Sequence, residues 1–332
     1  MMVLPTEGTV TLRLITFTTG NETHVGALDG ETAVSLTRAS GADPRFASML
    51  DLVRAGHTAL DDARELIDSH PSDSVRDVQD VTLRAPLPNP TRFRDCSLFI
   101  AHLQPAFRGM ARTLAAQADD PDAEYERLVA TGKFDTPEVF SRQVIYYNAD
   151  HTAVSGPGDV IVAPSESRQL DYELEFAAVM GTTAKDVAHE DASAVIFGYT
   201  ILNDWSCRDL QMTVMESQLG PSRGKDFDGS NTFGPCIVTP DELGSPYELQ
   251  MEARVNGEVW SHGSSSTMHH SFEDAIVHFS RGRTIHAGDV LGTGTVMSGS
   301  PIEIGKRLKD GDEVELEVEG IGVLRNRVQL SY

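Results

Sequence analysis

The first 70 residues divide into an alternating segment and a segment with helical spacing. Between residues 9 and 40, the apolar runs TLRLITF, HVGALDG and ETAVSL are separated by a Gly-Asn and an Asp-Gly dipeptide, which favour turns. This pattern predicts a small antiparallel β unit. Residues 45–70 then carry apolar side chains at helical spacing, and they predict a helix: Phe46, Met49, Leu50 and Val53.

A proline-rich segment follows the predicted helix. Prolines occupy positions 86, 88 and 90, and this density interrupts regular secondary structure. We therefore expect a linker near residues 84–91. It would separate a small N-terminal α/β domain, residues 1–88, from a larger catalytic domain, residues 89–332.

The larger segment is rich in strand patterns. Alternating or β-branched runs predict strands at residues 160–164, 173–181, 235–239, 249–260, 289–294 and 312–328. Helices are expected over residues 97–130, 191–212 and 272–281. The dipeptide Asn256-Gly257, between two alternating runs, predicts a hairpin turn. Many strands with few regular βαβ repeats favour an α+β fold whose larger domain has a mostly β, barrel-like core.

Composition argues against several classes of function. In 332 residues, 27 Lys and Arg against 50 Asp and Glu give a net charge of −23, which disfavours nucleic acid or an anionic membrane as partner. The cysteines, Cys96, Cys207 and Cys236, form no CxxC pair and are expected to be reduced thiols. The sequence shows neither a secretory leader pattern nor a run of about 20 apolar residues, so we expect a cytoplasmic protein.

An acidic strand carries the clearest chemical signal. In the stretch DYELEFAAVMG, residues 171–181, alternation places Glu173 and Glu175 on one face of a strand. Two neighbouring carboxylates repel each other and are costly to bury, so they need a cation between them or open water above them. The alternative interpretation is a solvated strand face.

A second cluster, NDWSCRDLQ at residues 203–211, ends an apolar run. If this segment is helical, Asp204, Arg208 and Gln211 share one face, where they could hold a metal and a carboxylate-bearing ligand. The alternative is an ordinary Asp–Arg helix pair. Asp209 lies off that face, and we expect it to cap or pair locally.

Two glycine-rich turns add polar groups to this set. The loop at residues 220–230 contains Lys225, one of only five lysines, which could anchor an anionic ligand or steady a metal shell. The turn GTGT at residues 292–295 would expose N–H groups and hydroxyls to a ligand. The hard oxygen donors Glu173, Glu175 and Asp204, without neighbouring His or Cys, fit Mg²⁺ best, with Ca²⁺ and Mn²⁺ as alternatives, whereas zinc would recruit His or Cys.

The acidic strand, the NDWSCRDLQ cluster and the two glycine-rich turns, in this order along the chain, resemble the fumarylacetoacetate hydrolase family. The resemblance rests on residues 171–181, 198–211, 220–235, 288–299 and 311–328, and above all on NDWSxRDxQ with an upstream DxELE. It implies a barrel-like catalytic fold behind a smaller N-terminal domain, a homodimer and a divalent metal. The implied chemistry is C–C bond cleavage in β-diketo acids, or a reaction of related oxo acids.

The resemblance also implies roles for individual residues. Glu173, Glu175 and Asp204 would ligate the metal. Asp95 lies seven residues before His102, as in the hydrolase branch, so Asp95 would be a further ligand and His102 the general base. Glu303 is the candidate partner of that histidine. The positions that hold the substrate or support the metal shell would be Arg208, Gln211, Lys225 and Thr295.

Three functions remain open at this stage. The first is a metal-dependent hydrolase that cleaves a β-diketo acid such as an acylpyruvate, with water activated by His102. The second is a lyase or isomerase, such as a decarboxylase, dehydratase or tautomerase, that acts on a 2-oxo acid with the same metal. The third is a metabolite-binding protein without catalysis. The pair Asp95 and His102 favours the hydrolase.

Overall fold

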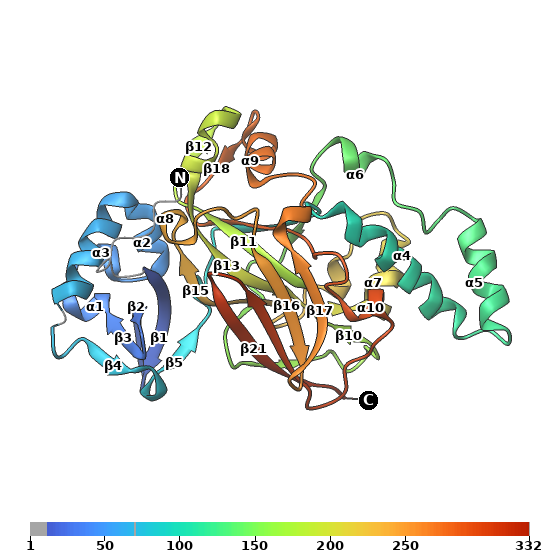
Figure 1. Cartoon of the computed structure of the whole chain (residues 1–332), viewed down its shortest axis with the longest axis horizontal. Coiled ribbons are helices and arrows are strands. Elements are labelled where there is room, and N and C mark those ends of the chain that lie inside the picture. Colours follow the sequence, from blue (N-terminus) through green and yellow to red (C-terminus); the bar gives the residue numbers. More distant parts are fainter. Residues whose placement is uncertain (1–11, 70, 332) are drawn as a thin grey trace.

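The computed structural model describes residues 12–69 and 71–331 and shows a mixed α+β fold (Figure 1). The expected fold class is therefore confirmed. The N-terminal strands and helices lie at one end of the molecule, and helices α4 (Ile100–Ala115) and α5 (Pro121–Ala130) lie at the other.

The N-terminal segment forms the predicted antiparallel unit. Strands β1 (Arg13–Thr19), β2 (Glu22–Asp29) and β3 (Thr32–Ser35) pair in sequence, followed by α1 (Leu36–Ala39), α2 (Met49–Ala55), α3 (His57–Ser69), β4 (Val75–Asp77) and β5 (Thr82–Arg84). Residues 9–11 of the predicted unit lie outside the described residues.

The helix predicted over residues 45–70 is divided in two. Helix α2 ends where Gly56 adopts φ +72°, and the Gly56 N–H donates to the carbonyls of Leu52 and Val53. A residue without Cβ adopts this left-handed conformation readily, so Gly56 ends one helix before α3 begins. The apolar spacing continues across the break, which is why the pattern alone predicted a single helix.

The main sheet connects the two predicted domains. Its strand order is β4-β3-β2-β1-β15-β13-β11-β19-β6-β7, with β5 on β1 and β8 (Val154–Ser155) on β15. The central strands are β6 (Arg92–Cys96), β7 (Tyr146–Ala149), β11 (Leu174–Met180), β13 (Ile196–Asp204), β15 (Asn231–Val238) and β19 (Asp289–Gly292). Because β1 pairs with β15, the N-terminal strands extend this sheet, and the domain division at residue 88 stays a prediction.

A second sheet packs across the first and encloses the largest apolar core. Its order is β17-β16-β20-β21-β9, from β9 (Val160–Val162), β16 (Gln250–Val255), β17 (Glu258–Ser264), β20 (Glu313–Val318) and β21 (Gly322–Gln329). The predicted turn at Asn256-Gly257 joins β16 to β17, with both residues at positive φ. Alternate side chains of β20 and β21 are buried, which is the alternation that predicted these strands.

The helix predicted over residues 191–212 is the clearest error of the sequence analysis. Residues Ile196–Asp204 form strand β13, buried on both faces, and helix α7 begins only at Arg208 and ends at Met215. A continuous apolar run has no periodicity that separates a central strand from a buried helix. The helix predicted over residues 272–281 is confirmed as α9 (Phe272–Ser280), and residues 97–130 contain α4 and α5.

The remaining elements are short. They are α6 (Val139–Arg142), α8 (Pro240–Leu243), α10 (Pro301–Ile304), β10 (Leu170–Asp171), β12 (Ala184–Lys185), β14 (Ser206–Cys207) and β18 (Thr284–Ile285). The cysteines are buried free thiols. Within the described part of the chain, every helix is too short or too polar to cross a lipid bilayer.

Candidate active site

Three carboxylates converge where neighbouring strands of the main sheet end. Asp95 comes from β6, Glu175 from β11 and Asp204 from the last position of β13, and one oxygen of each lies within 4.8 Å of the others. Strand β19 lies between β6 and β11, and its Gly292 faces Asp95. A Cβ at Gly292 would lie 2.4 Å from Asp95 Oδ1, so glycine at this position makes room for the acidic cluster.

This cluster, Asp95, Glu175 and Asp204, is electrostatically costly without a cation. Burial and the charge of Asp204 raise the pKa of Asp95 to about 8. Burial and the charge of Asp95 raise the pKa of Glu175 well above its usual range, and burial raises that of Asp204. Among the described residues, Glu175 Oε2 and Asp204 Oδ1 have no hydrogen-bond partner. Buried, unpartnered carboxylate oxygens fit a hard divalent cation.

Glu173 directly precedes β11 and lines the same pocket as Glu175, but it is ion-paired to basic side chains. Lys225 Nζ donates to Glu173 and Asp204, and Arg208 Nη2 lies 2.8 Å from Glu173 Oε1. Burial alone would raise the pKa of Glu173, but the charges of Lys225 and Arg208 lower it overall. Glu173 is thus bonded to Lys225, which also contacts Asp204 of the acidic cluster, and to Arg208. The role of Glu173 as a fourth metal ligand stays a prediction.

Each of the three guanidinium nitrogens of Arg208 is bonded to another side chain of the protein. It is the first residue of α7, only 1% exposed, and donates to Asp171 at 3.0 Å, Glu173 at 2.8 Å and Gln211 at 3.0 Å. Arg208 and Gln211 share a helix face as predicted. Asp204 does not, because it lies in β13. The guanidinium is therefore committed to holding the site together.

Asp171 and Asp209 both accept hydrogen bonds from segments distant in the sequence. Besides Arg208, Asp171 accepts from the N–H of Ile302, and burial raises its pKa to about 6 although Arg208 opposes the shift. We expected Asp209 to cap or pair locally; it accepts from the neighbouring Leu210 N–H, but also from the Ser167 hydroxyl and the Arg168 N–H, 42 and 41 positions away. The sequence analysis did not single out Asp171, although it begins the DYELE stretch.

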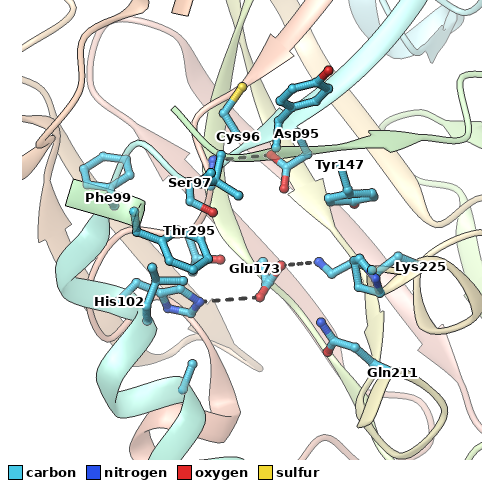
Figure 2. Close-up of a pocket in the computed structure, with 18 of the residues that line it drawn as sticks. Asp95, Cys96, Ser97, Phe99, His102, Tyr147, Glu173, Gln211, Lys225 and Thr295 are labelled. Atoms are coloured by element: carbon cyan, nitrogen blue, oxygen red, sulfur yellow. Dashed lines mark hydrogen bonds and ion pairs between the residues drawn. The ribbon is translucent and has the colours of Figure 1, made fainter. Parts of the chain in front are cut away.

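His102 and Glu303 meet at the edge of the pocket. His102 lies in α4, and its Nδ1 is 2.8 Å from Glu303 Oε2. On the other side of the ring, its Nε2 is 3.8 Å from Glu173 Oε1, the contact that Figure 2 marks. Glu303 lies in α10, where it accepts from the N–H groups of Ser298 and Ser300. A fixed carboxylate beside Nδ1 favours a proton on that nitrogen and leaves Nε2 available as a base.

Several groups around the acidic cluster complete the site. Tyr147, from β7, donates its hydroxyl to Asp204 Oδ2 at 2.7 Å, and burial raises the pKa of this tyrosine well above its usual range. The predicted GTGT turn contributes the Thr295 hydroxyl, 3.3 Å from Glu175 Oε1, and the Gly294 N–H, 3.3 Å from Asp95 Oδ1. Sequence reasoning missed Tyr147 because nothing in its local pattern distinguishes it from a core tyrosine.

Eight of the ten candidate site residues line one pocket, whose cavity has a volume of about 260 Å³; the other two are Asp204 and Glu303. Figure 2 shows His102 and Phe99 on one side, Lys225 and Gln211 on the other, and Glu173 between them. Asp204 lies behind Lys225 and Tyr147, and Glu303 lies behind His102. The arrangement provides a cation site, a histidine base with a carboxylate partner, and polar groups that could orient an acidic ligand.

The fold and this set of side chains are those expected for the fumarylacetoacetate hydrolase family. The family model described as fumarylacetoacetate (FAA) hydrolase C-terminal matches residues 121–329, and the chain belongs to this family. The resemblance stated from the sequence is thus confirmed. The match leaves out β6 and α4, which carry Asp95 and His102.

Relatives and solved structures give the range of activities. The oxaloacetate tautomerase YisK of Bacillus subtilis (strain 168) is 30% identical over 85% of this chain and 86% of its own length. The mitochondrial oxaloacetate tautomerase Fahd2a of Rattus norvegicus is 36% identical over 55% of this chain, which spans 58% of that protein. A fumarylacetoacetate hydrolase from Exiguobacterium antarcticum superposes with a TM-score of 0.73 at 27% identity and covers 96% of this chain and 100% of that one.

A further solved structure shows a relative of the same fold with ligands. It is maleylpyruvate hydrolase from Sphingobium sp. SYK-6 in complex with manganese(II) and pyruvate, with a TM-score of 0.69 and 22% identity, covering 97% of this chain and 100% of that one. Hydrolases and tautomerases thus share this fold, and the more similar relatives described above are tautomerases that act on a small 2-oxo acid.

Proposed function

We propose that this protein is a metal-dependent isomerase that interconverts the keto and enol forms of a 2-oxo acid, with oxaloacetate as the first substrate to test. The sequence analysis placed a C–C bond hydrolase first and an isomerase second. The relatives support the second interpretation better, because both described above are oxaloacetate tautomerases.

The observation that carries the proposal is the position of His102. Its Nδ1 faces Glu303 at 2.8 Å, and its ring lines the pocket into which Glu173 and Glu175 also point. Keto–enol interconversion requires one base to move a proton at C3 of the substrate. It requires neither an activated water nor a leaving group.

The acidic cluster Asp95, Glu175 and Asp204 would hold the cation, with Glu173 as the candidate fourth ligand. A divalent ion, once bound, polarises the 2-oxo group and balances the negative charge that develops on its oxygen. We take Mg²⁺ as the first candidate and Mn²⁺ as the second, because the Sphingobium relative binds manganese.

The protein's own groups would then orient the substrate and move the proton. His102 Nε2 would take the proton from C3 of the keto form, and the enolate oxygen would be protonated by solvent. In the reverse direction the enol oxygen would lose its proton to solvent while His102 returns a proton to C3. The side-chain amide of Gln211 and the hydroxyl of Thr295, both in the pocket lining, would bind the substrate carboxylate. Glu303 would hold the imidazole in position during both steps.

The test follows the enol absorbance of oxaloacetate after its enol form is dissolved in aprotic solvent and diluted into buffer. Metal-loaded protein should accelerate the decay of the absorbance, with oxaloacetate unchanged in mass. The spontaneous rate in buffer with the same metal is the control. Decay no faster than this control, with metal content verified, would refute the tautomerase.

The hydrolase remains the second candidate, because the pair His102 and Glu303 could equally activate a water molecule. Its test uses an acylpyruvate, with pyruvate as the product detected by mass spectrometry. Formation of pyruvate at a rate above that of oxaloacetate ketonisation would favour the hydrolase.

The homodimer and the cytoplasmic location stay predictions from the sequence. Gel filtration of the purified protein tests the homodimer.

A further inference from the structure

The wall of the pocket across from Lys225 and Gln211 is largely apolar. One face of helix α4 lines the pocket with apolar side chains at spacings i, i+4, i+7, i+8 and i+11. This apolar stripe consists of Phe99 at the N-cap, Leu103, Ala106, Phe107 and Met110. His102 is the only polar side chain that α4 contributes to the lining. Figure 2 shows Phe99 next to His102, across Glu173 from Lys225 and Gln211.

Other elements extend this apolar wall. Phe140 from α6, Ile145 before β7 and Met215 at the end of α7 also line the pocket. Leu103, Phe107, Phe140, Ile145 and Met215 are only partly buried. Core packing would bury them fully, whereas these side chains keep apolar surface facing the cavity, where the apolar part of a ligand could cover it.

The basic side chains that line this pocket are already used by the protein. Arg208 is bonded to Asp171, Glu173 and Gln211, and Lys225 to Glu173 and Asp204. One substrate carboxylate can be served by the cation, Gln211 and Thr295. A second carboxylate would face the apolar wall without a cationic partner, and removing it from water there is costly.

We infer that the preferred substrates are 2-oxo monocarboxylic acids with an apolar group on C3, such as an aryl or branched alkyl group, rather than oxaloacetate. This inference rests on the proposed function, because it assigns the substrate class of the same site. The stripe on α4 lies outside the residues matched by the family model, so family membership alone does not define this wall.

The test compares phenylpyruvate with oxaloacetate on the metal-loaded, full-length protein. Binding is measured by calorimetry, and turnover by exchange of the C3 hydrogens with D₂O in NMR spectra. Each buried methylene contributes roughly fourfold in affinity, so phenylpyruvate should bind at least tenfold more tightly. It should also show the higher kcat/KM. Equal or tighter binding of oxaloacetate would overturn the inference.

Variants separate the wall from general effects on folding. Phe107→Ala should weaken phenylpyruvate binding on the order of tenfold and leave oxaloacetate within a factor of two, with Phe107→Leu between wild type and Phe107→Ala. Leu114→Ala, on the same helix but outside the pocket lining, is the matched control and should change neither. Equal losses for both acids in Phe107→Ala would contradict a substrate-contacting wall.

The two levels of the proposal fail differently. If phenylpyruvate binds tightly but neither acid exchanges its C3 hydrogens, the tautomerase is wrong and the apolar specificity stands. If oxaloacetate exchanges rapidly and phenylpyruvate neither binds nor exchanges, the tautomerase stands and the apolar specificity is wrong.

Discussion

Replacing Glu303 by glutamine tests whether this carboxylate positions the catalytic base. Glu303 Oε2 lies 2.8 Å from His102 Nδ1, and the carboxylate is itself held by N–H groups of Ser298 and Ser300. Glu303→Gln keeps the size of the side chain but removes the negative charge beside the imidazole. The two N–H groups bond to different carboxylate oxygens, and the NH₂ group of glutamine can replace only the shape of one of these acceptors. The variant should therefore fold with a modest loss of stability and lose mainly catalysis.

The expected magnitude follows from the geometry. At an effective dielectric constant of about 20, two unit charges 2.8 Å apart attract each other by about 6 kcal/mol. The amide dipole of glutamine retains part of this attraction. A loss of about 3 kcal/mol in the transition state, where His102 carries the proton, lowers kcat on the order of 10²-fold.

The assay is the exchange of C3 hydrogens of the 2-oxo acid in D₂O, fitted separately for kcat and KM. We expect kcat to fall, KM to stay within a few-fold, and the free energy of unfolding to decrease by about 1–3 kcal/mol, because one buried N–H group loses its acceptor. Glu258→Gln, an exposed glutamate paired with Lys306, is the matched control and should leave both constants unchanged. A Glu303→Gln variant with kcat within threefold of wild type would refute the positioning role.

Three further predictions concern the metal, the arginine and the helix contact. Because the pKa of Asp95 is raised to about 8, metal binding at pH 7 must displace its proton, so the affinity for the metal should fall as pH decreases from 8 to 6. Calorimetry in buffers of different ionisation enthalpy should detect the released proton. A metal affinity that does not depend on pH would contradict this prediction. Arg208→Lys should destabilise the protein by about 3 kcal/mol in urea unfolding and lower kcat/KM equally for acidic substrates and their neutral esters. A decrease in kcat/KM confined to the acids would instead mean that Arg208 binds the substrate carboxylate. Gly109→Ala would place a Cβ 2.2 Å from the Ile302 carbonyl and separate α4 from α10, so kcat should fall on the order of tenfold with metal content unchanged; an unaltered kcat would show that this contact does not position the base.

Local patterns predicted the elements that have clear periodicity or turn chemistry. The N-terminal hairpins, the Asn256-Gly257 turn and the alternating strands β20 and β21 follow directly from the sequence. Strand β13 could not be recognised in this way, because burial on both faces removes the alternation that identifies a strand.

The resemblance named residues that lie close together in the structure, but it did not reveal the hydrogen bonds that connect them. The structure brings Asp95, Glu175 and Asp204 together and puts His102 beside Glu303, as the resemblance implied. Partners that depend on long-range packing were not predictable. Tyr147, 57 positions from Asp204, and Asp171, 37 positions from Arg208, were missed because no local pattern encodes such contacts.

The apolar stripe on α4 shows a different limit. Its spacing is visible in the sequence, but the same spacing describes any helix that packs against a core. Only the structure shows that Leu103 and Phe107 face a cavity beside His102.

The most direct measurement of the central claim is C3 hydrogen exchange of a 2-oxo acid in D₂O, with three samples of equal protein concentration. These are the Mg²⁺-loaded wild type, the wild type after treatment with EDTA, and metal-loaded His102→Ala. We expect rapid exchange in the first sample, exchange at the buffer rate in the second, and a rate reduced on the order of 10²–10⁴-fold in the third, with metal content equal to that of the first. Exchange in metal-loaded His102→Ala at the wild-type rate would contradict the central claim.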